Sequence, residues 1–287
     1  MDSGIVLLSI ASAMFIALGI VLTRFGLRGL GPISGGSISV PTSALMFLAL
    51  SPWTVDYNNW HWGAAAIFAA AGLIYPAAVT LLNFASNERL GPNMTAAMGN
   101  LTPLFAIALA MLLLHEYPRP VQAAGVGVVI AGLFLVTTAQ MSRLPSAALI
   151  LLGLPLAAAI LRGAAQPLVK IGLQDWPNAF AAALLSYAVS ALTIWAVRLV
   201  RRGPVRPFDL AAHLWFMLIG VSNGLGLAAL YAALALGSVH VVAPIVASYP
   251  LITMGLTWAL HGREPLSKRA LIGTAISVAG VVLVLRG

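Results

Sequence analysis

The sequence contains no cysteine and few charged residues, and each shortage excludes a class of protein. Without cysteine the chain has no disulfide, no thiolate nucleophile and no cysteine-based metal site. Asp, Glu, Lys and Arg make up 8% of the 287 residues, whereas a soluble domain carries roughly 25%. The chain is therefore not an ordinary soluble protein, and its surroundings are expected to be mostly lipid.

Apolar residues are abundant instead, at 61% of the chain, and the mean hydropathy is +0.99. Because one membrane-spanning helix needs about 20 residues, the length accommodates about ten spans and no globular domain. The apolar runs are long and continuous, which favours helices over a membrane barrel. They predict an all-α integral membrane protein with ten transmembrane helices, at approximately 3–23, 33–53, 62–84, 92–114, 120–140, 146–168, 178–197, 211–236, 241–261 and 270–285.

The basic residues between these runs predict how the chain is oriented, because Lys and Arg favour the cytoplasmic side of a membrane. Eleven of the 15 stand after the first, third, fifth, seventh and ninth spans: Arg24, Arg28, Arg89, Arg143, Arg198, Arg201, Arg202, Arg206, Arg263, Lys268 and Arg269. The other connections hold Arg119, Lys170 and Arg286. We therefore expect a multi-pass protein of the inner (cytoplasmic) membrane with both termini outside the cytoplasm. Nucleic acid is not an expected partner, since the basic residues are spread over membrane loops.

An internal repeat is the strongest pattern in the sequence. Residues 116–132 and 264–280 both read Glu, eight residues, Gly, six residues, Gly, at an offset of 148 residues. A Leu-Gly pair and a proline precede each stretch at nearly equal spacing: Leu90, Gly91 and Pro103, then Leu236, Gly237 and Pro250. The pattern predicts two five-helix repeats, 1–141 and 142–287. An odd number of spans inverts the second repeat, which is typical of secondary transporters.

With this duplicated pattern the chain resembles the drug/metabolite transporter superfamily, specifically the EamA-type members built from two inverted five-helix repeats. The resemblance covers the whole chain. It implies a basket of helices around a central cavity, alternating access to the two membrane faces, and frequently export of amino acids, metabolites or drugs. Members of this kind usually look cytoplasmic at both termini, whereas the loop charges here predict the reverse.

Arg162 is the one basic residue well inside a predicted span, 146–168. A charge at that depth costs a few kcal/mol and usually faces a cavity or a partner. Gln166 lies one turn later on the same helix face. Together the two residues are predicted to bind a substrate carboxylate or another anion. The alternative is that Arg162 snorkels to the interface, or bonds backbone carbonyls freed near Pro155 or Pro167.

Two proline-containing clusters occupy equivalent places in the two repeats. They comprise Asn100 to Pro103 in span 92–114 and Ser248, Tyr249 and Pro250 in span 241–261. Proline frees backbone carbonyls, and helix breaks at matching positions of two halves indicate a transport site. We predict that both clusters line the cavity, with a purely structural kink as the alternative. Three more polar residues inside spans complete the predicted substrate site: Tyr75, Asn83 and Asn223.

The acidic residues and histidines fall near span ends, which limits the chemistry available within the membrane. Glu116 and Glu264 each precede a helix, with Pro118 and Pro265 close behind, so they are expected to act as caps or loop anchors. The first span has no acid, so the buried glutamate of small multidrug antiporters in this superfamily has no counterpart. The five histidines have no metal-ligand spacing, and no metal site is expected.

The sequence thus predicts a secondary active transporter, with export as the expected direction, of a small metabolite such as an amino acid or a drug-like compound. The alternative is an integral-membrane enzyme acting on lipid or isoprenoid substrates, but such an enzyme needs clustered acids or histidines. A Gly-Lys-Ser/Thr phosphate loop is also missing, which argues against ATP-driven transport by this chain alone. The expected partners are the lipid bilayer and a small-molecule substrate, without a cofactor, in a monomer or homodimer.

Overall fold

The computed structural model describes residues 3–141, 146–200, 209–261 and 268–286, and all regular secondary structure within these ranges is helical. Eight of the described segments are long and apolar enough to cross a membrane. Thr102–Leu113 and Ala275–Arg286 are shorter apolar helices. The predicted class, an all-α integral membrane protein, is therefore confirmed, while the count of ten spans stays a prediction.

The first half of the chain is built from helices that follow the predicted apolar runs. They are α1 (Ser3–Gly26), α2 (Pro32–Thr54), α3 (Trp62–Gly72), α4 (Val79–Met98), α5 (Thr102–Leu113) and α6 (Pro120–Met141). Short 3-10 helices lie at Tyr57–Asn59 and Gly99–Leu101, and a π-helical segment lies at Leu73–Ala78. Within Trp62–Met98 the backbone leaves helical geometry at Tyr75 and at Gly91. This 37-residue apolar stretch is therefore divided into shorter pieces.

The second half has a related order of elements. It contains a short turn, Ser146–Leu152, then α7 (Gly153–Asp175), α8 (Ala179–Val200), α9 (Leu210–Leu236), α10 (Val239–Val246), α11 (Tyr249–His261) and α12 (Lys268–Arg286). In the first half, a 3-10 turn at Gly99–Leu101 lies within the fourth apolar run, between α4 and α5. In the second half, two residues separate α10 from α11 within the fourth run.

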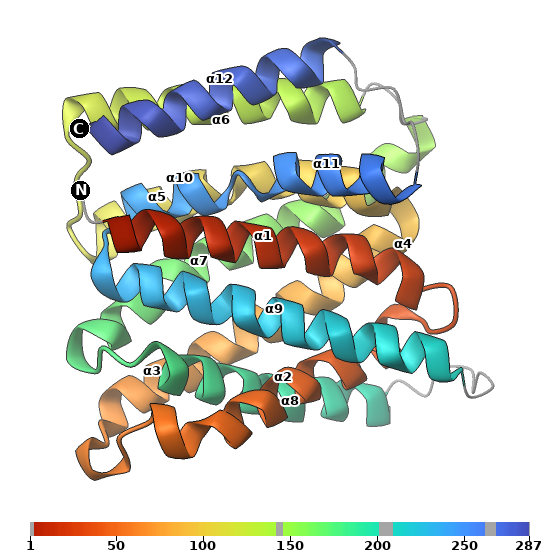
Figure 1. The fold of residues 1–287 in the computed structure, drawn as a ribbon, viewed down its shortest axis with the longest axis vertical. Coiled ribbons are helices and arrows are strands. Elements are labelled where there is room, and N and C mark those ends of the chain that lie inside the picture. Colours follow the sequence, from red (N-terminus) through yellow and green to blue (C-terminus); the bar gives the residue numbers. More distant parts are fainter. Residues whose placement is uncertain (1–2, 142–145, 201–208, 262–267, 287) are drawn as a thin grey trace.

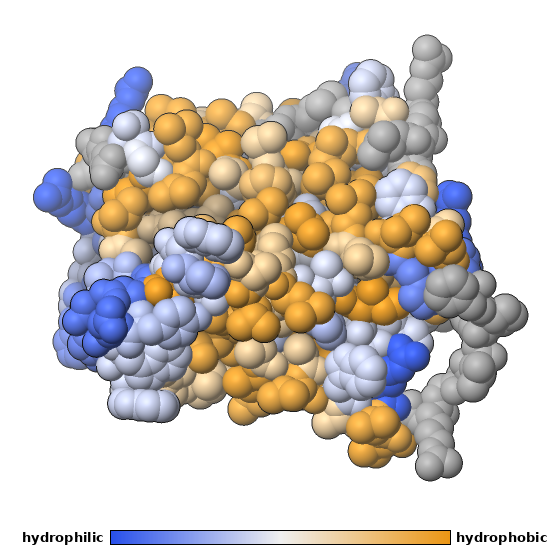
Figure 2. Space-filling model, turned by 60° about the horizontal axis from the view of Figure 1, so that its bottom comes forward, coloured by the Kyte–Doolittle hydropathy of each residue, from blue (hydrophilic) through white to orange (hydrophobic). Residues whose placement is uncertain are grey.

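The helices lie side by side and cross the molecule from one end to the other (Figure 1). At one end α1 begins and α12 ends, and we call this the terminal end. At the opposite end α1 and α8 finish with Arg24 and Arg198, and α12 starts with Lys268, so we call this the basic end. Figure 2 shows apolar side chains over the middle of the bundle and hydrophilic ones at its two ends, as expected for a protein surrounded by lipid.

The repeated glycines lie where α6 and α12 pack against each other. A Cβ atom at Gly132 would stand 2.5 Å from the backbone nitrogen of Ser277 and 2.6 Å from the carbonyl oxygen of Gly273. Reciprocally, a Cβ at Gly273 would stand 2.6 Å from the carbonyl oxygen of Gly132. Gly125 and Gly280 meet in the same reciprocal way. The duplicated spacing therefore reflects two helices whose backbones touch, a contact that only small residues allow.

Small residues also bring α1 and α9 together, and these two helices form one wall of the site described below. The Ser12 hydroxyl donates to the carbonyl oxygen of Gly226 at 2.8 Å, and the Ser222 hydroxyl donates to that of Phe15 at 2.8 Å. Side-chain bonds of this kind join helices in lipid, where little hydrophobic force is available to do so.

The Leu-Gly pairs mark helix ends. Gly91 has a φ of 80° within α4, a left-handed conformation that glycine adopts without steric cost. Gly237 follows the last residue of α9 in an extended conformation. Each pair therefore ends one helical segment just before the interrupted fourth run of its repeat.

Glu116 acts as a cap, but for a distant helix. Its carboxylate accepts a hydrogen bond of 2.7 Å from the backbone N–H of Val239, the first residue of α10. Lys170 of α7 donates to the carbonyl oxygens of Leu234 and Gly237, at 2.5 and 2.8 Å, where α9 ends. Two charged residues thus satisfy the open backbone groups between α9 and α10. The repeat counterpart of Glu116, Glu264, lies outside the described residues.

Candidate functional site

A pocket lies within the bundle, between α1, α4, α7, α8 and α9. It is lined by Ile16, Gly19, Ile20, Thr23, Tyr75, Thr80, Asn83, Phe84, Asn87, Thr95, Arg162, Tyr187 and Asn223. The residues from α1 and the first part of α4 are spaced three, four and seven apart, so each helix presents one face over two turns. At 1.5 Å per residue, the pocket extends about 10 Å along these helices.

Arg162 is the only ionised side chain among the described lining residues. It is 7% exposed, so it does not snorkel to the membrane interface. Its Nη1 donates to the Tyr249 hydroxyl at 3.2 Å, and its guanidinium carbon lies 5.2 Å from the Tyr75 ring centre and 5.6 Å from that of Tyr249. Its Nε has no hydrogen-bond partner in the part of the chain that the structure describes. Two aromatic faces and one hydroxyl therefore hold the charge, which leaves donors free for a ligand.

Helix breaks position both tyrosines. Tyr75 has extended dihedral angles, φ −139° and ψ 120°, between α3 and α4, and Pro76 behind it lacks the N–H that would continue the helix. Tyr249 is the first residue of α11, and Pro250 follows it in the first turn. Pro103 takes the equivalent place in the first turn of α5. The start of α11 at Tyr249 brings this side chain to Arg162.

The remaining predicted site residues divide into two groups. Asn83 and Asn223 line the pocket, and the Asn223 side chain lies close against Gly19 of α1. Gln166 is 2% exposed, one turn beyond Arg162, outside the lining, and its Oε1 has no partner among the described residues. Ser248 is half-buried in the turn between α10 and α11, also outside the lining. The side chain of Asn100 lies outside what the structure describes.

Sequence reasoning missed several polar residues of the pocket, above all Asn87. The predicted span ended at residue 84, but the helix that begins at Val79 continues beyond it, so Asn87 is 6% exposed inside the bundle. The spacing of Thr80, Asn83 and Asn87 on one helix face is the signal that could have revealed it.

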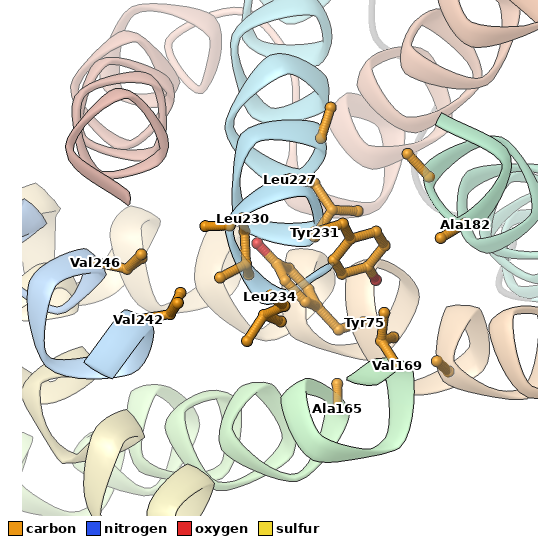
Figure 3. Close-up of a cluster of buried hydrophobic side chains, with 14 of the residues drawn as sticks. Tyr75, Ala165, Val169, Ala182, Leu227, Leu230, Tyr231, Leu234, Val242 and Val246 are labelled. Carbon is orange, nitrogen blue, oxygen red and sulfur yellow. The ribbon is translucent and has the colours of Figure 1, made fainter. Parts of the chain in front are cut away.

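On the side of the terminal end, closely packed apolar residues close off the pocket. Leu227, Leu230, Tyr231 and Leu234 of α9 are 0 or 1% exposed. Figure 3 shows Val242 and Val246 of α10 and Ala165 and Val169 of α7 around them, beside Tyr75. We call this cluster the apolar barrier: Leu227, Leu230, Tyr231, Leu234, Val242, Val246, Ala165 and Val169. Because α9 runs from the basic end to the terminal end, the barrier lies beyond Asn223 toward the terminal end.

A multi-pass helical bundle with a buried polar pocket beside matching helix breaks has the architecture of a secondary transporter. The comparison with family models agrees. The EamA-like transporter family matches residues 3–138 and, a second time, residues 148–286, so the chain belongs to this family. The membership predicted from the duplicated pattern is therefore confirmed.

Comparisons with individual proteins add less detail than the family match does. The chain is 36% identical over 180 residues to Proline-rich transmembrane protein 4 of Homo sapiens. That match covers 61% of this chain and 18% of the human protein, so the chain spans a small part of its relative. A solved protein crystal structure at 14% identity superposes with a TM-score of 0.77, covering 99% of this chain and 96% of that chain. This second likeness supports the fold alone.

Proposed function

We propose that the chain is a secondary active transporter that moves a small carboxylate-bearing metabolite, such as an amino acid or an anionic drug-like compound. The proposal includes ten transmembrane helices in two inverted repeats, 1–141 and 142–287, and alternating access at the central pocket. The observation that carries it is Arg162, a buried cation in a pocket whose described lining contains no carboxylate. A buried charge without a counterion costs free energy, and a bound anion would offset that cost.

The pocket residues have separate roles in this proposal. The guanidinium of Arg162 binds the substrate carboxylate, and Tyr75 and Tyr249 fix its orientation. Asn83 and Asn223 supply neutral hydrogen-bonding groups along the same pocket. Gln166 lies one turn farther toward the terminal end, so it belongs to the path that the substrate takes when the apolar barrier opens.

Export is the direction of transport that we propose. The apolar barrier separates the pocket from the terminal end, while Thr23 lines it one residue before Arg24 of the basic end. Since Lys and Arg favour the cytoplasmic side, the basic end faces the cytoplasm in our proposal. In the alternating-access cycle that we propose, substrate would bind from the cytoplasm, and opening of the barrier would release it outside.

Transport by purified protein in liposomes tests the proposal. Labelled amino acids, short dicarboxylates and organic cations such as choline would be offered, with protein-free liposomes as the control. We expect at least one carboxylate to accumulate and the cations to stay outside, because the described pocket lining offers a cation and no anion. Accumulation of cations alone, or of no carboxylate, would contradict the proposal. Conversion of added lipid or isoprenoid without accumulation would support the membrane-enzyme alternative.

The proposed orientation makes a separate prediction. A fluorescent reporter that matures only in the cytoplasm, fused after Gly287, should stay dark, because most loop Lys and Arg are expected at the opposite, cytoplasmic end. The same reporter inserted between Arg202 and Gly203 should be bright and serves as the control for expression. A bright signal after Gly287 would reverse the orientation and, with it, the proposed direction of export.

A further inference from the structure

Asn87 places an unused hydrogen-bond acceptor in the pocket. Its Nδ2 donates to the carbonyl oxygen of Ile20 at 2.8 Å, which links α4 to α1 and fixes the orientation of the amide. Its Oδ1 is buried and has no partner among the described residues. A buried acceptor without a partner is costly, and a ligand donor would remove that cost.

The link between the helices does not explain this acceptor. A hydroxyl or a single N–H donor at position 87 could bond Ile20 without leaving a buried oxygen unpaired. The neighbouring Thr95 hydroxyl is satisfied, since it bonds the Ser86 hydroxyl at 2.8 Å and the Gly91 carbonyl oxygen at 2.9 Å. Asn87 differs from Thr95 in having a buried acceptor available to a ligand.

Two buried atoms of the pocket residues lack a hydrogen-bond partner among the described residues, and they have opposite character: the donor Nε of Arg162 and the acceptor Oδ1 of Asn87. The Arg162 guanidinium, a donor, is held at Tyr75, where the chain enters α4. Asn87, an acceptor, lies two turns beyond Thr80 on the same helix, about 10 Å along its axis. The wall between them includes the apolar side chains of Ile20 and Phe84.

We propose that the Asn87 Oδ1 forms a second subsite, which accepts a hydrogen bond from a donor at the far end of a linear substrate whose carboxylate binds Arg162. This inference rests on the proposed function. The donor is an ammonium or a hydroxyl group, since both can bond a neutral amide oxygen. The α-amino and α-carboxyl groups of an amino acid are attached to one carbon, so this pair of groups is too close together to occupy both subsites. The pocket lining extends about 10 Å along α4, and a carboxylate with its donor at the other end of a chain of about six carbons matches that length.

Calorimetric titration of the full-length protein with isomeric probes tests the subsite. The probes are 6-aminohexanoate, its isomer norleucine, and hexanoate, which lacks the donor. We expect 6-aminohexanoate to bind about tenfold more tightly than either of the others, the effect of one added hydrogen bond. Equal affinity for norleucine and 6-aminohexanoate would overturn the second subsite and leave the proposed function intact. Failure of all three probes to bind would count against both.

Variants of Asn87 test whether this residue causes the difference in affinity between the probes. Asn87→Leu should remove the tenfold advantage of 6-aminohexanoate over hexanoate. The control Asn58→Leu replaces an exposed asparagine outside the pocket lining and should preserve the advantage. If Asn87→Leu does not fold, Asn87→Asp is the variant that tests the second subsite. Its negative charge should raise the affinity for 6-aminohexanoate relative to 6-hydroxyhexanoate about tenfold, because only the amine is cationic. An unchanged ratio, or an advantage that survives in Asn87→Leu, would overturn the inference.

Discussion

Arg162→Gln is expected to weaken carboxylate binding about 100-fold while leaving the protein at least as stable as before. A hydrogen bond to a charged group contributes about 1.5 to 3 kcal/mol, and roughly every 1.4 kcal/mol is a factor of ten in affinity. Stability should not fall, because the variant removes a buried charge, and the described lining of the pocket holds no carboxylate to pair with that charge. The combination of lost binding and kept stability is characteristic of a ligand-binding residue.

Two milder variants separate charge from geometry at the same site. Arg162→Lys keeps the positive charge but loses the planar pair of donors, so affinity should fall about tenfold. Tyr249→Phe keeps the ring that lies 5.6 Å from the guanidinium carbon and removes the hydroxyl that accepts from Nη1, which should cost a few-fold in affinity.

Calorimetric titration of the best transported carboxylate measures affinity, and the melting temperature measures stability, in wild type and all three variants. A structural role for Arg162 gives the opposite signature. Arg162→Gln would then melt at a lower temperature, and the molecules that remain folded would bind the carboxylate as wild type does.

The fold was predictable where glycine, proline or a charged residue stands out from the apolar runs around it. Helix-ending Leu-Gly pairs and prolines recur at nearly fixed spacing, and glycines are required where α6 and α12 touch, so the duplication remains visible along the chain. Arg162 was recognisable for the same reason, since a charge in a long apolar run is rare.

Contacts between distant residues were not predictable, because they leave no local pattern. Arg162 and Tyr249 are 87 residues apart, and Glu116 caps a helix 123 residues away. The apolar barrier gave no signal either, since Leu230 or Val242 does not stand out in a chain that is 61% apolar. Asn87 was missed because helix ends are read from sequence with an error of several residues.

Gly132→Leu is expected to destabilise the protein strongly, because the new side chain would meet backbone atoms that have no rotamer to change. Its Cβ alone would lie 2.5 Å from the Ser277 nitrogen, so α6 and α12 would have to separate. Overpacking of this kind costs about 1 to 3 kcal/mol, or more where backbone must move. We expect a fall in melting temperature of about 5 to 10 °C, measured on purified protein.

A matched control lies on the same helix. A Cβ atom at Gly127 would have no neighbouring atom within 4 Å among the described residues, so Gly127→Leu should leave the melting temperature unchanged. In Gly273→Leu the new side chain meets the same helix contact from α12. The fall in melting temperature should therefore equal that of Gly132→Leu, as the repeat symmetry requires. The double variant should cost less than the two single variants together, since one separation of the helices accommodates both side chains. Equal losses at Gly127 and Gly132 would mean that leucine is unfavourable anywhere on α6, and that backbone contact is not the reason for the glycine spacing of the repeat.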